Sequence, residues 1–225
     1  MADKPYRDLD TITKVALAVL VVLSLLELAR LGGLLIQNNL LVSFRDHTFT
    51  GDYMQAARAN DARLRTLAPL TTVAVLTMLI VFLRWTYRAM SNVHALGAAG
   101  VDSPAWAVGC FFIPFVNLVA PYTAMSQIWR ASISAGDWKA ENAPIVGIWW
   151  ALWLIAGLSG WIMILMAGQH GIDPALLRTR GTMADTALDI VRNVVMMIMV
   201  IRVRAAQNAQ WHVADSFGGA PVVPS

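Results

Sequence analysis

Long apolar runs separated by shorter polar stretches dominate the chain. Three such runs cover residues 15–36, 67–83 and 145–167, and a fourth at 187–203 is interrupted by Arg192 and Asn193. At about 1.5 Å per helical residue, runs of this length can cross a hydrocarbon core about 30 Å thick. The pattern therefore predicts an all-α integral membrane bundle with four full spans.

A further uncharged stretch, from Ser103 to Gln127, breaks this regularity. Pro114 and Pro121 lie seven residues apart within it, and each removes a backbone donor and strains a continuous helix. Both a kinked span and a re-entrant segment fit this pattern, and a full crossing would make five spans. A small excess of flanking Lys and Arg on the side of the N-terminus favours four spans with both ends inside.

The remaining boundaries follow from polarity. We expect a single membrane domain over residues 1–225, with a cytoplasmic N-terminal segment at 1–11 and a polar extramembrane loop at 37–66. Good helix formers at 53–67 allow a helix inside that loop. The Gly- and Pro-containing C-terminus, 212–225, is predicted to be a disordered tail.

Composition supports the membrane class and narrows the functions. Hydrophobic residues make up 57% of the chain and charged residues 14%, too few charges to cover a soluble globule or to keep a chain disordered. The formal net charge is +3, but Lys and Arg are scattered, so nucleic-acid binding is not expected. The sequence lacks the zinc-protease, nucleophile-elbow and P-loop motifs, so we expect no enzyme, metal or cofactor.

The Pro-broken segment is one candidate ligand or ion site. Broken helices expose backbone carbonyls and amides, and transporters use such breaks to bind substrates. Asn117, between Pro114 and Pro121, adds an amide that can both donate and accept. The alternative is a packed kink in which Asn117 bonds the backbone groups that the prolines free.

Charged and amide side chains next to the apolar runs form two more candidate groups. Arg84, Arg88 and Asn92 recur every four residues, and with Arg130 they are candidate contacts for lipid phosphate or another anion. The alternative is a solvated anchoring face. Within the runs lie Glu27 and Arg30, three residues apart, and the pair Arg192 and Asn193. Intramembrane ionisable groups are functional candidates, although a structural ion pair or snorkelling near a helix end fits them as well.

A dense motif covers residues 84–132. It begins Arg84-Trp-x-Tyr-Arg88 and Asn92, continues through Ser103-Pro-x-Trp106 and Pro114-x-x-Asn117-Leu-x-x-Pro121-Tyr, and ends at Ile128-Trp129-Arg130. This motif resembles a bacterial multi-pass membrane family known as domain of unknown function 4328, over roughly residues 66–205. Ala120 and Cys110 depart from that family's pattern. The resemblance implies a membrane protein and supplies no chemistry.

These features predict a multi-pass protein of the bacterial plasma membrane, with a cytoplasmic N-terminus and a binding, sensing or accessory role. The alternative is an oligomeric channel or transporter whose site is the Pro114–Pro121 break. The expected partners are membrane lipids and either a second copy of the chain or another membrane protein.

Overall fold

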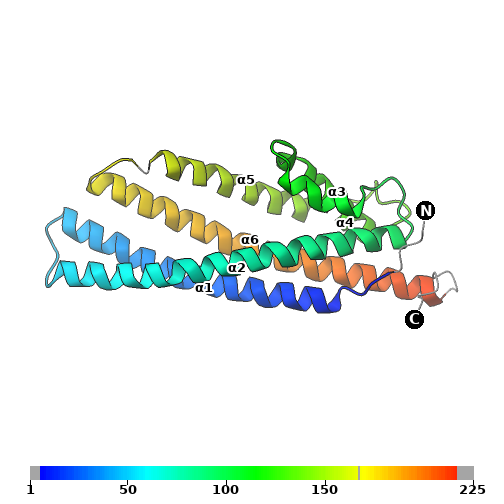
Figure 1. The fold of residues 1–225 in the computed structure, drawn as a ribbon, viewed down its shortest axis with the longest axis horizontal. Coiled ribbons are helices and arrows are strands. Elements are labelled where there is room, and N and C mark those ends of the chain that lie inside the picture. Colours follow the sequence, from blue (N-terminus) through cyan, green and yellow to red (C-terminus); the bar gives the residue numbers. More distant parts are fainter. Residues whose placement is uncertain (1–5, 167, 217–225) are drawn as a thin grey trace. The chain divides into compact units, whose positions relative to one another are not determined.

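The chain forms a set of long and short helices (Figure 1). A computed structural model describes residues 6–166 and 168–216, and every regular element in that part of the chain is helical. The long helices are α1 (Asp10–Arg45), α2 (Tyr53–Ala95), α5 (Pro144–Leu165) and α6 (Ile172–Ser216). The short elements are α3 (Pro104–Gly109), η1 (Cys110–Phe112), η2 (Val116–Leu118) and α4 (Ala120–Ile133). The all-α prediction is confirmed.

Three helices, α1, α2 and α5, are long and apolar enough to cross a membrane. Each contains one of the three uninterrupted or nearly uninterrupted runs that the sequence indicates. The fourth expected span, 187–203, lies within α6, where Asp189, Arg192 and Arg202 lower its hydropathy. A count of three candidate spans is therefore what the described helices support, and the fourth span stays a prediction.

The chain divides into two compact units, each built from separate segments. Unit 1 contains the described residues of 1–18, 78–150 and 195–225, and unit 2 contains residues 19–77 and 151–194. The division cuts through all four long helices, so α1, α2, α5 and α6 each contribute to both units.

Unit 2 contains two helical hairpins, which Figure 1 shows at the α1–α2 and α5–α6 connections. In the first hairpin the side-chain amide of Asn60, which is 2% exposed, donates to the Gly33 carbonyl at 3.1 Å. A Cβ on Gly33 would lie 2.7 Å from the end of the Leu64 side chain, so a larger residue there would require that side chain to move. In the second hairpin Ser159 donates to Asp185 at 2.5 Å.

Several expected boundaries are wrong. Residues 37–66 are not a loop throughout, because α1 continues through Arg45, whereas the helix expected from residue 53 is present as the first turns of α2. The carboxylate of Asp52 accepts from the Gln55 amide at 3.0 Å, an N-terminal cap that starts α2 early. Residues 212–216 belong to α6 instead of a disordered tail, and residues 217–225 lie outside the described part of the chain. Of the N-terminal segment 1–11, residues 1–5 also lie outside it, and α1 begins at Asp10.

In unit 1, α2 ends and α3 begins with standard capping. Gly97 has φ 87°, and its amide donates to His94 while the next amide donates to Val93, which completes a Schellman motif. Ser103 caps α3 by accepting from the Trp106 amide at 3.1 Å, with Pro104 in the first turn. These two caps hold the connection 96–103 between α2 and the motif segment.

The Pro-broken segment is not a continuous kinked helix, so that alternative is wrong. Helix α3 stops at Gly109, and two short 3-10 turns separate it from α4. The η1 turn ends at Phe112 with Ile113 extended, and Phe115 has a positive φ of 64°, so helical geometry is interrupted on both sides of Pro114. Pro121 occupies the first turn of α4, where its missing N–H breaks no helical hydrogen bond.

The core of unit 1 contains a chain of buried amide side chains. Gln207 of α6 is completely buried and donates to the Ala89 carbonyl at 3.1 Å and to the Ser132 hydroxyl at 2.9 Å. Its carbonyl accepts from Asn92 of α2 at 3.0 Å. One glutamine therefore joins α2, α4 and α6, and removing it would leave several buried polar groups without partners.

Candidate functional site

A cavity of about 630 Å³ in unit 1 brings together three arginines. It is lined by Arg7, Leu83, Arg84, Tyr87, Arg88, Ser91, Asn92 and Val108. Arg84 and Arg88 lie one helical turn apart on the last turns of α2, so their side chains project from the same face. Arg7 comes from the segment before α1. We call this site the arginine cavity.

Asn92 brings Arg7 to the cavity. The Arg7 amide donates to the Asn92 side-chain oxygen at 3.0 Å, and the Asn92 amide nitrogen donates back to the Arg7 carbonyl at 2.7 Å. This reciprocal pair fixes the backbone of a residue 85 positions away in sequence. The place of Arg7 therefore depends on the interior of unit 1 and not on its own side chain.

None of the three arginines makes an ion pair with a residue that the structure describes. The Nε of Arg88 is buried and has no hydrogen-bond partner there. Withdrawing a guanidinium N–H from water without a new partner costs free energy, and three like charges around one cavity repel each other. An anion in the cavity would relieve both effects.

Tyr6, next to Arg7 in the chain, is anchored deep in unit 1. Its hydroxyl donates to Asn208 at 2.6 Å, and its ring stacks on Trp211 at 4.6 Å between centroids. Burial raises the pKa of Tyr6 to about 12, and the charges of Asp8 and Asp10 act in the same direction. The positive charge of Arg88 opposes this shift in pKa, so Arg88 acts electrostatically on the segment that carries Arg7.

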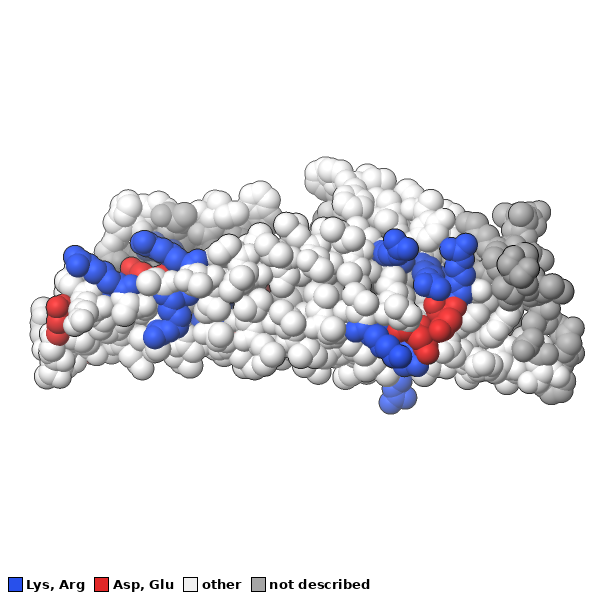
Figure 2. Space-filling model, turned by 60° about the horizontal axis from the view of Figure 1, so that its bottom comes forward, with Lys and Arg blue, Asp and Glu red and all other residues white. Residues whose placement is uncertain are grey.

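Figure 2 shows where charge gathers on one face of unit 1. Basic and acidic side chains adjoin one another at the right of the view, surrounded by uncharged surface. In unit 1, Asp10 pairs with Arg204 and accepts from Asn208 at 3.2 Å. The Asp8 carboxylate accepts from the Asp10 amide at 2.8 Å.

The role expected for Asn92 as a lipid or anion contact needs correction. Its side chain is 0% exposed, and both ends are bonded, to Arg7 and to Gln207. An amide with these bonds holds the protein together and has little capacity left for a ligand. Asn92 is a positioning residue that lies below Arg84 and Arg88 on the same stripe of α2.

Arg130 does not join the arginine cavity. It lines a separate cavity of about 320 Å³ in unit 1, with Ser126 and Gln127 of α4 and Lys139 of the following loop. The Nε of Arg130 is buried without a partner, as the Nε of Arg88 is. The four residues predicted as one anion-contacting group therefore separate into two cavities and one buried anchor.

The arginines that the sequence places within the apolar runs, Arg30 and Arg192, are paired. Arg30 lies 3.4 Å from Glu27, and Arg192 lies 2.8 Å from Asp189, each pair three residues apart on its own helix. Arg192 therefore has a carboxylate partner in place of the carbonyls or snorkelling that the sequence allows. Asn193, beside it, is 7% exposed.

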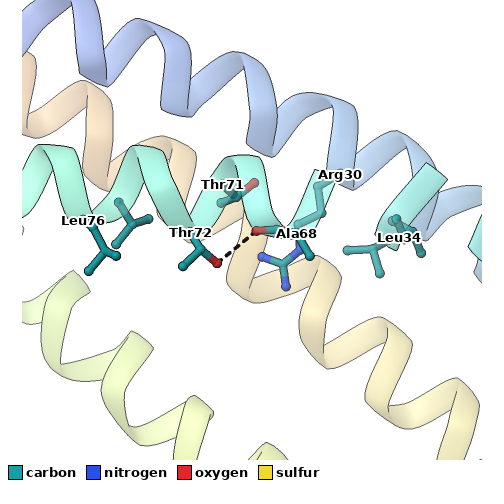
Figure 3. Close-up of a pocket in the computed structure, with 8 residues that line it drawn as sticks. Arg30, Leu34, Ala68, Thr71, Thr72 and Leu76 are labelled. Carbon is teal, nitrogen blue, oxygen red and sulfur yellow. Dashed lines mark hydrogen bonds between the residues drawn. The ribbon is translucent and has the colours of Figure 1, made fainter. Parts of the chain in front are cut away.

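Arg30 also lines a largely apolar cavity of about 480 Å³ with residues of α2. Figure 3 shows its guanidinium near Ala68 and Thr72, and Thr72 donates to the Ala68 carbonyl at 3.0 Å. The buried hydroxyl of Thr71 has no hydrogen-bond partner in the described chain. Because Arg30 is already paired with Glu27, this cavity presents less free charge than the arginine cavity.

Pro114, Asn117 and Pro121 line none of these cavities. Asn117 is half-exposed, and its side chain makes no hydrogen bond to a described residue, so it does not bond the backbone that the prolines free. The segment is instead held by the Trp150 indole, which donates to the Leu118 carbonyl at 3.2 Å. Phe115 is 84% exposed.

Sequence reasoning missed Arg7, Ser126 and Lys139. Arg7 carries no local signal, because its position comes from the bond to Asn92 far along the chain. Ser126 lies four residues before Arg130, a helical spacing that can be read from the sequence.

The described part of the chain is all-helical, and three of its helices are long and apolar enough to cross a membrane. The family described as a domain of unknown function (DUF4328) matches residues 50–206, so the chain belongs to that family. The match includes Arg84, Arg88 and Arg130, whereas Arg7 lies before it. Comparison with curated proteins and with solved structures found no match.

Proposed function

We propose that this protein is a multi-pass plasma-membrane component that binds the phosphate headgroup of an anionic lipid in the arginine cavity. The observation that carries the proposal is the convergence of Arg7, Arg84 and Arg88 without a carboxylate partner in the described chain. Guanidinium groups bind phosphate oxygens through two parallel N–H donors, which a zwitterionic headgroup with its own ammonium satisfies less well.

The place of these arginines in the sequence supports a headgroup as the ligand. Arg84 and Arg88 directly follow the uncharged run that ends at Leu83, so they lie where α2 reaches the headgroup region. Leu83 and Val108 add apolar surface to the cavity, which suits the glycerol and first acyl carbons of a lipid. With the N-terminus cytoplasmic, the site faces the leaflet that holds anionic lipid.

A binding role is favoured over transport and catalysis. The channel alternative requires a site at Pro114–Pro121, and no cavity described above is lined by that segment. The arginine cavity holds three cations, and no histidine or carboxylate lines it that could activate Ser91 or Tyr87 as a nucleophile, which suits recognition of an anion. Arg7 is hydrogen-bonded to Asn92, and Asn92 to the buried Gln207, so a lipid bound to Arg7 can influence the interior of unit 1.

The test measures lipid retention by the full chain in nanodiscs that contain phosphatidylcholine and phosphatidylglycerol. Native mass spectrometry of the purified wild type should detect bound phosphatidylglycerol in excess of its share. Arg84→Gln/Arg88→Gln should lower the affinity for phosphatidylglycerol about 25-fold, because each arginine near a charged headgroup contributes about fivefold and the two factors multiply.

Arg58→Gln/Arg65→Gln provides the matched control, since it removes the same charge from exposed positions of the same helix. It should leave retention within about twofold of wild type, because exposed charges are screened by salt. Equal losses in the two double variants, or no preference for the anionic lipid in wild type, would refute the proposed function.

A further inference from the structure

The cavity that contains Arg130 has the features of a second and separate anion site in unit 1. Its polar lining comes from Tyr122, Ser126, Gln127 and Arg130 of α4 and from Trp138 and Lys139 of the loop that follows. It shares no lining residue with the arginine cavity. Its volume, about 320 Å³, is close to half that of the arginine cavity, so it suits a small ligand.

Helix geometry places three donors of α4 on one face. Tyr122, Ser126 and Arg130 are spaced by four residues, so a hydroxyl, a second hydroxyl and a guanidinium follow one another along the helix. Lys139 adds a second positive charge from the loop, and no carboxylate lines the cavity. The lining therefore offers donors and cations to an acceptor that bears negative charge.

Ser126 shows that the chain itself does not satisfy this cavity. Ser126 is 5% exposed, and its hydroxyl oxygen is buried without a hydrogen-bond partner in the described chain. Ser132, on the same helix, shows the usual alternative, because its hydroxyl donates to the Ile128 carbonyl at 2.6 Å. A buried hydroxyl without a partner destabilises the protein, and a ligand oxygen would remove that cost.

The walls of the cavity are held by bonds that leave the side-chain donors of Tyr122, Ser126, Arg130 and Lys139 without a hydrogen bond in the described chain. The Trp138 indole donates to the Ala99 carbonyl at 3.0 Å, and this bond fixes the indole ring and the loop to which it belongs. The Lys139 nitrogen lies 5.7 Å from the centre of that ring. The Gln127 side-chain oxygen accepts from the Asp102 amide at 2.7 Å. The arrangement is preorganised, so little ordering accompanies binding.

We propose that this cavity binds a phosphate group. Arg130 and Lys139 supply the charge, and the hydroxyls of Ser126 and Tyr122 supply hydrogen bonds to the remaining phosphate oxygens. Phosphate has several acceptor oxygens arranged tetrahedrally, which matches donors that approach from a helix face and from a loop. The phosphate can belong to a lipid headgroup or to a free phosphate or phosphate ester.

The experiment titrates the full chain in neutral detergent with inorganic phosphate and follows heat by calorimetry. Wild type should bind phosphate saturably. Ser126→Ala should weaken binding about fivefold, and Arg130→Gln about tenfold or more, since bonds to charged groups are the stronger. Arg58→Gln, an exposed arginine of α2, should leave the affinity unchanged.

A second arm repeats the phosphate titration on the chain in nanodiscs that contain phosphatidylglycerol and counts retained lipid for the same variants. Displacement of phosphate by the anionic lipid identifies a headgroup as the ligand, whereas phosphate binding without displacement identifies a free phosphate. Arg84→Gln/Arg88→Gln should leave phosphate binding at this cavity intact, so failure of the proposed function and failure of this second site are distinguishable.

A matched serine pair separates ligand binding from folding. Ser126→Ala should leave the melting temperature without ligand unchanged or raise it, because it removes a buried hydroxyl that has no partner. Ser132→Ala should lower the melting temperature and leave phosphate affinity unchanged, because its hydroxyl bonds Ile128 and Gln207. The inference is overturned if Ser126→Ala and Arg130→Gln alter neither phosphate affinity nor lipid retention.

Discussion

Arg30 and Arg192 of unit 2 and Arg84 and Arg88 of unit 1 have opposite surroundings. In unit 2, Arg30 and Arg192 each have a carboxylate three residues earlier on the same helix, at 3.4 Å and 2.8 Å. In unit 1, Arg84 and Arg88 have no ion-pair partner in the described chain, and each lines a cavity together with Arg7. The residue type is the same, and both settings adjoin apolar helices.

The difference shows how local sequence decides the role of a charge in this protein. A carboxylate three residues away on a helix satisfies an arginine without help from tertiary structure. An arginine without such a neighbour needs a partner from elsewhere in the fold. Arg204 of unit 1 has Asp10, whereas Arg84 and Arg88 line their cavity with another arginine, Arg7. Paired arginines therefore stabilise the chain, and the unpaired ones are available to a ligand.

The largest effect is expected from breaking a pair in unit 2. Glu27→Leu should lower the free energy of unfolding by about 2 kcal/mol, because Glu27 is 5% exposed and its loss leaves Arg30 without its partner. This figure is below the usual cost of a fully buried pair because the Arg30 side chain is 36% exposed. Unfolding in a mixed-detergent titration measures it.

The double variant Glu27→Leu/Arg30→Leu sharpens that prediction. Replacing both charges with apolar groups should restore most of the stability, since neither is left unpaired in the apolar helices. If Glu27→Leu/Arg30→Leu is no more stable than Glu27→Leu, the loss of stability does not come from leaving the Arg30 charge unpaired.

An intermediate effect is expected from the residue that positions Arg7. Asn92→Leu removes three side-chain hydrogen bonds and leaves the Arg7 amide and carbonyl without them, so stability should fall by about 1–2 kcal/mol. Retention of phosphatidylglycerol in nanodiscs should also fall, about threefold, because Arg7 is no longer held in the cavity.

Ser91→Ala, next to Asn92 and also lining the cavity, is the control for this change. It should affect stability by less than about 0.5 kcal/mol. If Asn92→Leu loses stability but retains lipid as wild type does, Asn92 supports packing alone and Arg7 does not contribute to the site.

The smallest effect is expected at an exposed pair. Arg45 and Asp46 lie 2.8 Å apart at the end of α1, with side chains 42% and 45% exposed. Arg45→Ala and Asp46→Ala should each change the free energy of unfolding very little, because water and salt screen such a pair. A larger loss would mean that pairing outside the apolar helices also stabilises unit 2. The same unfolding titration measures it.

Much of the fold follows from local pattern, and the site follows only in part. The apolar runs predict α1, α2 and α5, and the spacing of Glu27 and Arg30 predicts that they can face each other. Helix formers at 53–67 indicate the first turns of α2, but the continuation of α1 through Arg45 could not be predicted from polarity, because this helix extends beyond its apolar run. Tertiary contacts and the Asp52 cap decide where those helices end.

The arginine cavity illustrates the remaining limit. Helical spacing correctly groups Arg84, Arg88 and Asn92 on one stripe of α2. It does not reveal that Asn92 is buried while Arg84 is exposed, because burial depends on α6 and on the segment before α1. Arg7 and Asn92 meet across 85 residues, a pairing that no local pattern encodes.

The most direct test compares Arg88→Gln with Arg192→Gln, two arginines of similar setting and opposite partnership. Each variant is measured for thermal unfolding in neutral detergent and for phosphatidylglycerol retention in nanodiscs. Arg88→Gln should lower lipid retention about fivefold and leave the melting temperature unchanged or raised. Arg192→Gln should lower the melting temperature and leave lipid retention unchanged, because Asp189 loses its partner. The same response from both variants, in either measurement, would contradict the distinction between paired and ligand-binding arginines.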